Sequence, residues 1–369
     1  MRINILQGAF LPVPPVRGGA IEKAWQLLGE AFVRAGHEVY HFSRLCDHLP
    51  EKEEINGVHH FRIKGADAVK HPALLKIKEF AYVWRARKLI PEGDILVTHS
   101  FWAPILFPKI RMGKIYVHVG RFPKGQLRYY SRAARLQVPT LAIAKAAADE
   151  LPDKFERVKV LPYPLSNPAR GVQPFSKRTK QVLFAGRIHP EKGIHVLVQA
   201  WKLLPDCLRK EWQLKIIGPW REAQGGAGYS YLKKIKELGG KEIEVCEPVF
   251  DPNELMKNYQ SSQIFVYPSL AERGETFGLA ALEAMSAGCV PIVSSLSCFR
   301  DFIKHHENGF IFNHDTDKPE LQLLVILEDL LSNKKLEPYG KKALMTATDY
   351  EADKVATGYL DDFRSVLNR

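Results

Sequence analysis

Short apolar runs alternate with helix-patterned segments along almost the whole of this 369-residue chain. Each run holds four to six residues, the length of a buried strand, and most are rich in Val and Ile. Strands that alternate with helices predict parallel sheets with right-handed crossovers, and such sheets bind ligands beyond the carboxyl ends of their strands. The runs occupy residues 3–6, 38–42, 94–99, 114–119, 140–144, 157–161, 181–186, 213–218, 242–247, 263–268 and 289–294.

A polar segment rich in proline interrupts this alternation near the middle of the chain, with Pro162, Pro164 and Pro168 followed by polar residues up to Lys180. Such a segment is typical of a domain boundary, and the chain is long enough for two cores. We therefore predict an α/β protein with two Rossmann-like α/β/α domains that face each other across a deep cleft. The predicted parts are an N-terminal domain of residues 1–170, a C-terminal domain of residues 171–350, and a helix in 351–369 that packs back on the first domain.

Several local patterns predict individual elements. Residues 20–36 have helical periodicity and end at Gly36, and Asn56-Gly57 between two apolar segments indicates a β-hairpin. A basic helix is expected at residues 74–90. In the second half, helices are predicted at residues 193–204, 229–238, 252–260, 277–287, 319–332, 336–347 and 351–367.

The excess positive charge of the chain lies in its first half. The formal net charge is +12, and residues 1–170 contain 27 Lys and Arg against 15 Asp and Glu, whereas residues 171–369 contain 26 of each. Residues 95–148 contain nine Lys and Arg and no acidic side chain. This asymmetry indicates an anionic partner for the first half, such as a phosphate, an acidic glycan, a membrane surface or a nucleic acid, or else a basic face exposed to water.

The stretch from Glu275 to Glu283 is the strongest functional signal. It follows the apolar run 263–268, and its residues Thr276, Phe277, Gly278 and Leu279 open a helix. Backbone N–H groups at a helix N-terminus suit an anion such as a diphosphate, and Gly278 permits close approach of a ligand. Glu283 is a carboxylate on an otherwise apolar helix, which favours hydrogen bonds to a ligand such as vicinal sugar hydroxyls.

Two cations come directly after the strand run 181–186. Arg187 and Lys192 are separated by a turn that contains proline, and this arrangement suits a diphosphate leaving group whose negative charge grows as a glycosidic bond breaks. Gly18 and Gly19 lie between the first strand and the first helix, where backbone N–H groups can approach a phosphate. They do not form the GxGxxG pattern of a dinucleotide site.

Candidate acceptor-binding residues lie in the first half. His118 and, as a weaker candidate, His99 end neighbouring strand runs, and Arg121, Lys124 and Arg128 follow. Positions 128, 132 and 135 would share one helical face, which suits a phosphate-bearing or acidic acceptor as well as it suits exposure to water. Helix 74–90 combines cations with an apolar stripe that fits either the core or a membrane surface. We read the D-x-D of residues 315–317 as a turn and expect no metal site.

Residues Glu275 and Glu283 resemble the E-x7-E motif of the retaining family 4 glycosyltransferases, which have the GT-B fold. The match extends over nearly the full chain, and it is strongest from residue 181 to residue 311. Arg187 and Lys192 match the G-R-x-x-x-x-K-G segment of that family, which begins here at Gly186. The inter-domain segment departs from the family pattern, because the usual Asn-Gly turn is absent from VLPYPLSNP.

The resemblance implies a role for each matching residue. Arg187 and Lys192 would stabilise the departing diphosphate, Glu283 would hold the ribose, and Glu275 with the backbone of residues 277–279 would position the donor sugar. His118 would bind this sugar near the reacting carbon, and the Gly18-Gly19 backbone would approach the diphosphate. Val249 or Phe250 would pack on a uracil base.

These observations predict transfer of a hexosyl group from a nucleoside-diphosphate sugar, with UDP-glucose as the preferred donor. The resemblance implies that the transfer retains the anomeric configuration and requires no metal ion. The acceptor would be a saccharide or a lipid-linked saccharide in cell-envelope or exopolysaccharide synthesis. Alternatives are a nucleotide-sugar epimerase of the same fold and a basic nucleic-acid-binding protein, although no nucleic-acid-binding motif is present and we expect no such partner. Five scattered cysteines indicate free thiols in the cytoplasm, and the basic N-terminal domain indicates peripheral contact with the inner face of the cell membrane as an alternative.

Overall fold

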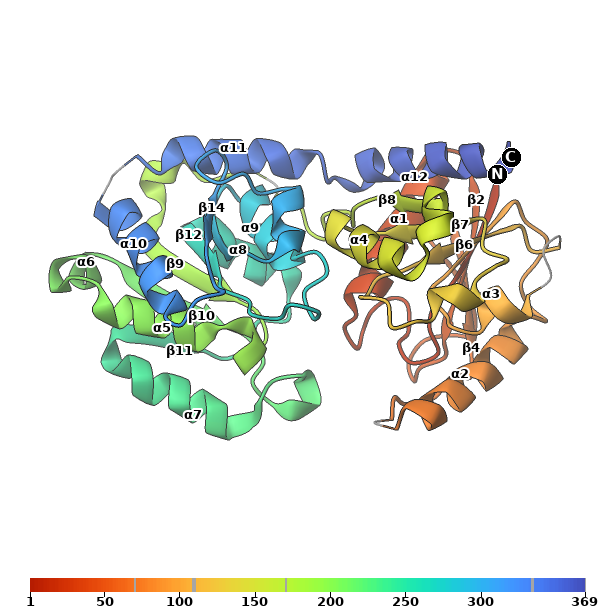
Figure 1. The fold of residues 1–369 in the computed structure, drawn as a ribbon, viewed down its shortest axis with the longest axis horizontal. Helices are drawn as coiled ribbons and strands as arrows, with labels where there is room; N and C mark the ends of the chain where they lie inside the picture. The colour runs from red at the N-terminus through yellow and green to blue at the C-terminus, as the bar shows by residue number, and fades with distance from the viewer. Residues whose placement is uncertain (70, 108–110, 170, 333–334, 369) are drawn as a thin grey trace. The chain divides into compact units, whose positions relative to one another are not determined.

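A computed structural model describes residues 1–69, 71–107, 111–169, 171–332 and 335–368 of the chain. The chain forms two compact units (Figure 1). Unit 1 consists of Met1–Ser166 together with Tyr350–Arg369, and unit 2 consists of Asn167–Asp349. The sequence prediction placed these boundaries after residues 170 and 350.

Unit 1 contains a sheet whose described strands follow the order β3-β4-β2-β1-β5-β6-β7-β8. All neighbouring strands are parallel except β3 and β4, and the register pairs Ile5 with His41 and Leu6 with Thr98. The carboxyl ends of the central strands therefore meet at one edge of the sheet. The strands are β1 Arg2–Leu6, β2 Glu38–Arg44, β3 Lys52–Ile55, β4 Val58–Ile63, β5 Ile95–Thr98, β6 Lys114–His118, β7 Arg135–Val138 and β8 Val158–Val160.

The predicted hairpin at Asn56-Gly57 is confirmed. Strands β3 and β4 are antiparallel, and Ile55 pairs with Val58 across the two turn residues. Asn56 has φ 50° and Gly57 has φ 79°. Asn and Gly adopt this left-handed conformation more readily than other residues, and a two-residue hairpin turn with positive φ at both positions matches the twist of the flanking strands.

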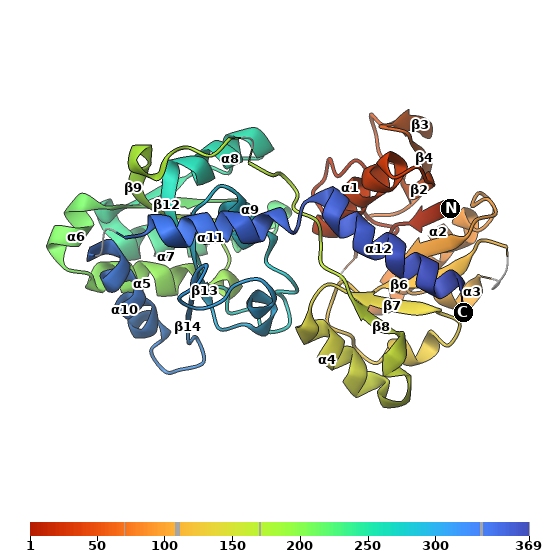
Figure 2. The same cartoon turned by 90° about the horizontal axis from the view of Figure 1, so that it is seen from above.

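Helices cover both faces of the first sheet. On one face α1 and α12 lie side by side, and they bury Trp25, Phe32 and Phe363 against strand residues such as Val97 (Figure 2). On the other face α2 and α4 bury residues such as Tyr82 against Leu96 and Val117. The helices of this unit are α1 Ala20–Arg34, α2 Pro72–Ala86, α3 Ala103–Leu106, α4 Leu141–Glu150 and α12 Ala352–Leu367.

Two local predictions in unit 1 are wrong. The apolar run 140–144 belongs to α4, which begins after Thr140, and the strand next to β6 is Arg135–Val138. Alanine is the strongest helix former, and the alanines of residues 141–148 outweigh the short apolar run. Arg128 lies in a short 3₁₀ helix, Leu127–Tyr129, while Arg135 begins β7, so positions 128, 132 and 135 do not share a helical face.

Unit 2 contains a parallel sheet whose described strands follow the order β11-β10-β9-β12-β13-β14. From β9 the chain proceeds outward through β10 to β11, and it then returns to β12 on the other side of β9. The strand order therefore reverses between β9 and β12, and ligands of open α/β sheets bind at this reversal. The strands are β9 Thr179–Ala185, β10 Gln213–Ile217, β11 Ile243–Cys246, β12 Ser262–Tyr267, β13 Val290–Ser294 and β14 Phe310–Phe312.

The helices of unit 2 form two groups (Figure 1). Helix α5 packs against α7 and α10, and α9 packs against α8 and α11. Right-handed crossovers place these groups on opposite faces of the sheet, because the strand order runs in opposite directions from β9 and from β12. The helices are α5 Ile194–Leu203, α6 Asp206–Glu211, α7 Gly228–Gly239, α8 Pro252–Ser261, α9 Leu279–Ser286, α10 Pro319–Ser332 and α11 Glu337–Thr348. The predicted helices at 319–332, 336–347 and 351–367 are thereby confirmed.

Candidate active site

The loops that follow β9 and β12 lie in direct contact at the strand-order reversal of unit 2. The N–H of Leu270 donates to the Glu191 carbonyl at 2.8 Å. Gly193 has φ 65°, and a Cβ atom at this position would lie 1.9 Å from the carbonyl oxygen of Pro268. Glycine is therefore required where the two loops cross, and the contact brings together residues from Gly186–Gly193 and from Pro268–Glu275.

Lys192 and Glu275 form a buried ion pair at this crossing. Lys192 Nζ lies 2.7 Å from Glu275 Oε2, and their side chains are 8% and 11% exposed. The sequence prediction gave these residues separate ligands, a diphosphate for Lys192 and sugar hydroxyls for Glu275. The structure instead brings them together as counterions. A phosphate that approaches this ammonium group therefore competes with a carboxylate.

Two residues that the sequence prediction missed complete this cluster. The ring of Tyr267 lies 5.4 Å from Lys192 Nζ, and the hydroxyl of Ser269 donates to Glu275 Oε2 at 3.4 Å. Burial and the nearby Glu275 carboxylate raise the pKa of the Tyr267 hydroxyl well above its usual value. Tyr267 is the last residue of β12 and Ser269 follows it in the loop, so polar residues where an apolar strand ends are the signal that could have identified them.

Arg187 is held in place from two sides. Its Nη2 lies 2.5 Å from Glu191 Oε1, and its Nη1 donates to the Gly225 carbonyl at 2.8 Å. Gly225 has φ 82°, and its missing Cβ would lie 3.0 Å from Arg187 Cδ. The glycine-rich segment after β10 therefore holds the guanidinium group in place. The Arg187 side chain is 44% exposed.

Helix α9 begins at Leu279 with Gly278 as its N-cap residue, so the Thr276–Leu279 segment opens the helix as the sequence predicts. Gly278 has φ 94°, and a Cβ atom here would lie 2.4 Å from the Phe299 ring. Because glycine has no side chain that could cap the helix, the first N–H groups of α9 lack a capping side chain. Phe277 is buried, whereas Thr276, Leu279 and Glu283 are half-buried.

The predicted base-contacting residues lie in the loop after β11, which is the outermost strand on that side of the sheet. Val249 is half-buried and Phe250 is 66% exposed. Their role in holding a base stays a prediction.

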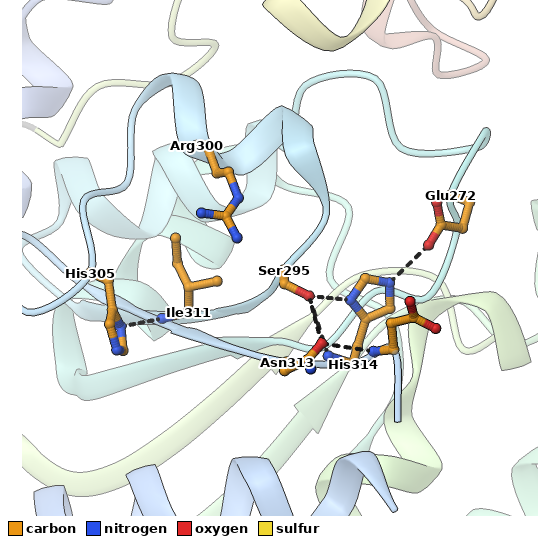
Figure 3. Close-up of a pocket in the computed structure, with 8 residues that line it drawn as sticks. Glu272, Ser295, Arg300, His305, Ile311, Asn313 and His314 are labelled. Carbon is orange, nitrogen blue, oxygen red and sulfur yellow. Dashed lines mark hydrogen bonds and ion pairs between the residues drawn. The ribbon is translucent and has the colours of Figure 1, made fainter. Parts of the chain in front are cut away.

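A separate pocket of about 490 Å³ lies beyond the ends of β13 and β14 (Figure 3). His314 spans it, with Nδ1 2.7 Å from the Ser295 hydroxyl and Nε2 3.2 Å from Glu272 Oε1. The first Asp of the D-x-D segment, Asp315, lines the pocket, and the segment forms a bend before α10. The predicted donor residues do not line this pocket. Its lining consists of Glu272, Ser295, Arg300, His305, Ile311, Asn313, His314 and Asp315.

His118 ends β6 in unit 1, and hydrogen bonds fix its ring. The Gln137 amide nitrogen donates to the Leu161 carbonyl at 2.7 Å, so its oxygen faces His118 Nδ1 and accepts the Nδ1 proton. His118 Nε2 therefore accepts from the Tyr163 hydroxyl at 2.9 Å. Burial lowers the pKa of His118 to about 4, so the ring is neutral at neutral pH.

The other candidate residues of this part of unit 1 are His99, Gly18 and Gly19. His99 packs 5.2 Å from His118 and 5.7 Å from Trp25, and burial lowers its pKa well below the usual value. Gly18 is exposed with φ 77°. A Cβ atom on Gly19, which has φ 118°, would lie 2.2 Å from Glu22 Oε2.

Arg121 follows β6 and is exposed, and its positive charge acts on the Glu22 carboxyl, whose pKa is raised by burial. Lys124 and Arg128 are also exposed, and the Arg128 guanidinium lies 4.9 Å from the Tyr129 ring. The structure therefore groups Gly19, His99, His118 and Arg121 at one edge of the first sheet. Their roles with an acceptor stay predictions.

Residues 167–343 match the model of the family described as glycosyl transferases group 1. An uncharacterized glycosyltransferase of Methanocaldococcus jannaschii is 27% identical over an alignment that covers 89% of this chain and 92% of that protein. Sucrose-phosphate synthase from Thermosynechococcus elongatus has a similar fold, with a TM-score of 0.78, 18% identity and coverage of 100% and 99% of the two chains. The Anabaena protein HepE in complex with UDP-glucose gives a TM-score of 0.70 at 16% identity, with coverage of 99% and 100%.

Together these observations define the class of the protein. Its two parallel-sheet α/β domains have the fold of the GT-B glycosyltransferases, and the matched segment begins at Asn167, where unit 2 begins. The protein is an enzyme of the glycosyltransferase class.

Proposed function

We propose that the protein transfers a hexosyl group from a nucleoside-diphosphate sugar to a saccharide or lipid-linked saccharide, with retention of the anomeric configuration. UDP-glucose is the preferred donor in this proposal, and cell-envelope or exopolysaccharide synthesis is the setting. The proposal places the chain among the retaining family 4 enzymes. The observation that carries it is the buried Lys192–Glu275 pair at the strand-order reversal, between Arg187 and the N-terminus of α9.

The ion pair suggests how donor binding prepares the site. A diphosphate brings two negative charges to Arg187 and Lys192, and Lys192 then exchanges the Glu275 carboxylate for a phosphate oxygen. Glu275 is released by this exchange and accepts hydrogen bonds from hydroxyls of the donor sugar. The N–H groups at the start of α9 add a partial positive charge that favours the same anion. Glu283, further along α9, binds the ribose hydroxyls.

In this proposal Arg187 and Lys192 stabilise the negative charge that develops on the leaving diphosphate, and no metal ion is required. The D-x-D segment follows β14, which β12 and β13 separate from β9 and its cations. We therefore expect transfer to continue in the presence of a chelator. In unit 1, the neutral His118 ring exchanges the Tyr163 hydroxyl for a hydroxyl of the donor sugar, from which Nε2 accepts a hydrogen bond. Arg121, Lys124 and Arg128 supply positive charge to an acceptor.

A thermal-shift panel of nucleotide sugars tests the first step of this proposal. UDP-glucose, other UDP-sugars, GDP-mannose and ADP-glucose are each added to the wild-type protein and to Glu283→Ala. A ligand at about 100 times its Kd stabilises the folded state by about 2.7 kcal/mol. We expect a UDP-sugar to raise the Tm of the wild type and not that of Glu283→Ala. Glu328→Ala, an exposed glutamate on α10, is the matched control.

If no nucleotide sugar stabilises the wild type, the proposed donor class is wrong. Incubation of the preferred donor without an acceptor separates a transferase from an epimerase, because only an epimerase converts the donor alone. NMR of the transferred sugar reports whether the anomeric configuration is retained.

A further inference from the structure

Helix α2 of unit 1 exposes an apolar face to solvent. Ile77 is 64% exposed, Trp84 is 48% exposed and Phe80 is 37% exposed, and their spacing of three and four residues places them on one side of the helix. Figure 1 shows α2 along the lower edge of unit 1 in that view. Large apolar side chains that gather on one exposed face indicate an interaction surface rather than part of the core.

The opposite side of α2 packs against the core of unit 1. Tyr82, Val83 and Ala86 are fully buried against the first sheet. Glu79 also faces inward, and its carboxylate accepts the N–H of Phe101 at 3.1 Å. Helix α2 therefore packs against the sheet through this inner side, and folding does not require Ile77 or Trp84 to be apolar.

The apolar face continues beyond α2 through a series of aromatic rings. Trp84 and Phe80 are stacked with centroids 6.1 Å apart, and Phe80 lies 5.4 Å from Trp102. Trp102 lies 5.1 Å from Phe101, which in turn lies 6.3 Å from Tyr129. We call this surface the aromatic face, and its members are Ile77, Phe80, Trp84, Phe101, Trp102 and Tyr129.

Cations border the aromatic face along its whole length. Lys76 Nζ lies 4.2 Å from the Phe101 ring centroid, the Arg87 guanidinium lies 5.6 Å from that of Trp84, and the Arg128 guanidinium lies 4.9 Å from that of Tyr129. Arg85 and Lys88 are exposed beside them. The single acidic residue of Pro72–Ala86 is Glu79, which is buried.

We propose that the aromatic face binds the surface of a lipid bilayer that contains anionic lipids. Tryptophan and tyrosine favour the level of the lipid headgroups, the apolar side chains enter the acyl boundary, and flanking Lys and Arg attract anionic headgroups. Both the composition and the exposed cations match this occupant. In the part of the chain that the structure describes, no helix is long and apolar enough to cross a membrane, so the contact is peripheral.

This inference is independent of the proposed sugar transfer, because no residue of the Lys192–Glu275 cluster takes part in it. It would place the first domain against a membrane, where a lipid-linked acceptor would be found. Failure of vesicle binding would leave donor binding intact. Failure of donor binding would leave vesicle binding intact.

Vesicle flotation with the full-length protein tests the proposal. The vesicles contain phosphatidylcholine alone or with about 30% phosphatidylglycerol, which supplies the anionic surface. We expect binding to the mixed vesicles only. Raising the salt from about 0.1 M to about 1 M shortens the Debye length from about 10 Å to about 3 Å and should release most of the protein.

Two variants separate the apolar and the cationic contributions. Ile77→Asp places a charge in the acyl boundary and should weaken binding at least about tenfold. Arg87→Gln with Lys88→Gln should weaken it about 25-fold, since each cation near an anionic surface contributes about fivefold. Val325→Asp and Lys234→Gln are matched controls on helices of unit 2, because Val325 is 68% exposed and Lys234 is exposed.

Three outcomes would overturn the proposal. The first is equal binding of the wild type to both kinds of vesicle, and the second is unchanged binding of both test variants. The third is a concentration-dependent dimer, seen by light scattering, that Ile77→Asp converts to a monomer without any vesicle binding by the wild type. That result would assign the aromatic face to contact between two copies of the chain.

Discussion

Lys192 Nζ and Glu275 Oε2 lie 2.7 Å apart in a site where neither side chain is more than 11% exposed. The pair joins the loop after β9 to the loop after β12. It therefore connects the stability of unit 2 to the two side chains that we assign to donor binding. A substitution of either partner leaves a charge in a largely buried place.

Lys192→Met should destabilise unit 2 by about 3 kcal/mol, because the Glu275 carboxylate loses its counterion. Adding Glu275→Gln should recover most of this loss, because the double variant carries neither charge. Urea unfolding of the wild type, both single variants and the double variant gives the coupling free energy. The exposed pair Lys341–Glu337 is the control, because its Nζ and Oε1 atoms lie at a similar separation of 2.8 Å but its side chains are 72% and 53% exposed. Its coupling should not exceed about 1 kcal/mol, and an equally small coupling for Lys192 and Glu275 would contradict the burial argument.

Stability should fall below pH 6.5 because of His118. Its pKa is about 4 in the folded protein and about 6.5 when unfolded, so the unfolded state binds the proton first as the pH falls. The contribution of neutral His118 to the unfolding free energy is complete above pH 6.5 and decreases as the pH falls to 4. At pH 5 the unfolding free energy should be lower by about 2 kcal/mol. His118→Gln should flatten the dependence of the unfolding free energy on pH by this amount. The exposed His71→Gln variant should leave the wild-type curve unchanged, and identical slopes for wild type and His118→Gln would show that this ring stays solvated.

Gly278→Ala should destabilise unit 2 by about 1–3 kcal/mol, because its Cβ would lie 2.4 Å from the Phe299 ring at a φ of 94°. Gly36→Ala isolates the backbone part of this effect, since Gly36 has φ 84° and no atom within 4 Å of the added Cβ. Thermal unfolding should show the larger loss for Gly278→Ala. Combining it with Phe299→Leu should restore part of the difference, and failure to do so would place the strain in the backbone alone.

Arg187→Lys should lower kcat by about 100-fold with little change in stability. Lysine retains the charge but cannot contact Glu191 and the Gly225 carbonyl at once, so the positive charge moves relative to the leaving group. Steady-state kinetics with the preferred donor, together with urea unfolding, separates the two effects. Arg273→Lys, on the exposed part of the loop after β12, is the control for a general effect of arginine replacement. A raised KM with unchanged kcat would assign Arg187 to ground-state binding only.

The sheets and the site loops of unit 2 followed from the sequence because their signals are local. An apolar strand that ends in a loop and is followed by a helix is visible at residues 181–194 and again at 263–286. The hairpin at Asn56-Gly57 had an equally local cause. The sequence predicted Lys192 and Glu275 as site residues, but their pairing depends on β9 and β12 being neighbours, which no local pattern contains.

The sequence did not predict the hydrogen bonds that fix His118, because these contacts join residues that are distant in the chain. Tyr163 and Gln137 fix the His118 ring from 45 and 19 residues away, and only the sheet brings them together. The helical face expected for Arg128 and Arg135 failed for a different reason. Helical periodicity was assumed across Tyr130–Ala134, where a turn separates a 3₁₀ helix from a strand.

Helix α12 completes the core of the first sheet although it is the last helix of the chain. Tyr359 and Phe363 pack among Trp25, Phe32 and Tyr116, and Asp362 forms a buried ion pair with Arg135 at 2.7 Å. During synthesis, residues 167–349 leave the ribosome before this helix does. Unit 2 can therefore finish folding first, while this face of the first sheet is covered by α1 but not yet by α12. A chain truncated after residue 349 would carry a folded unit 2 attached to an incomplete, aggregation-prone unit 1.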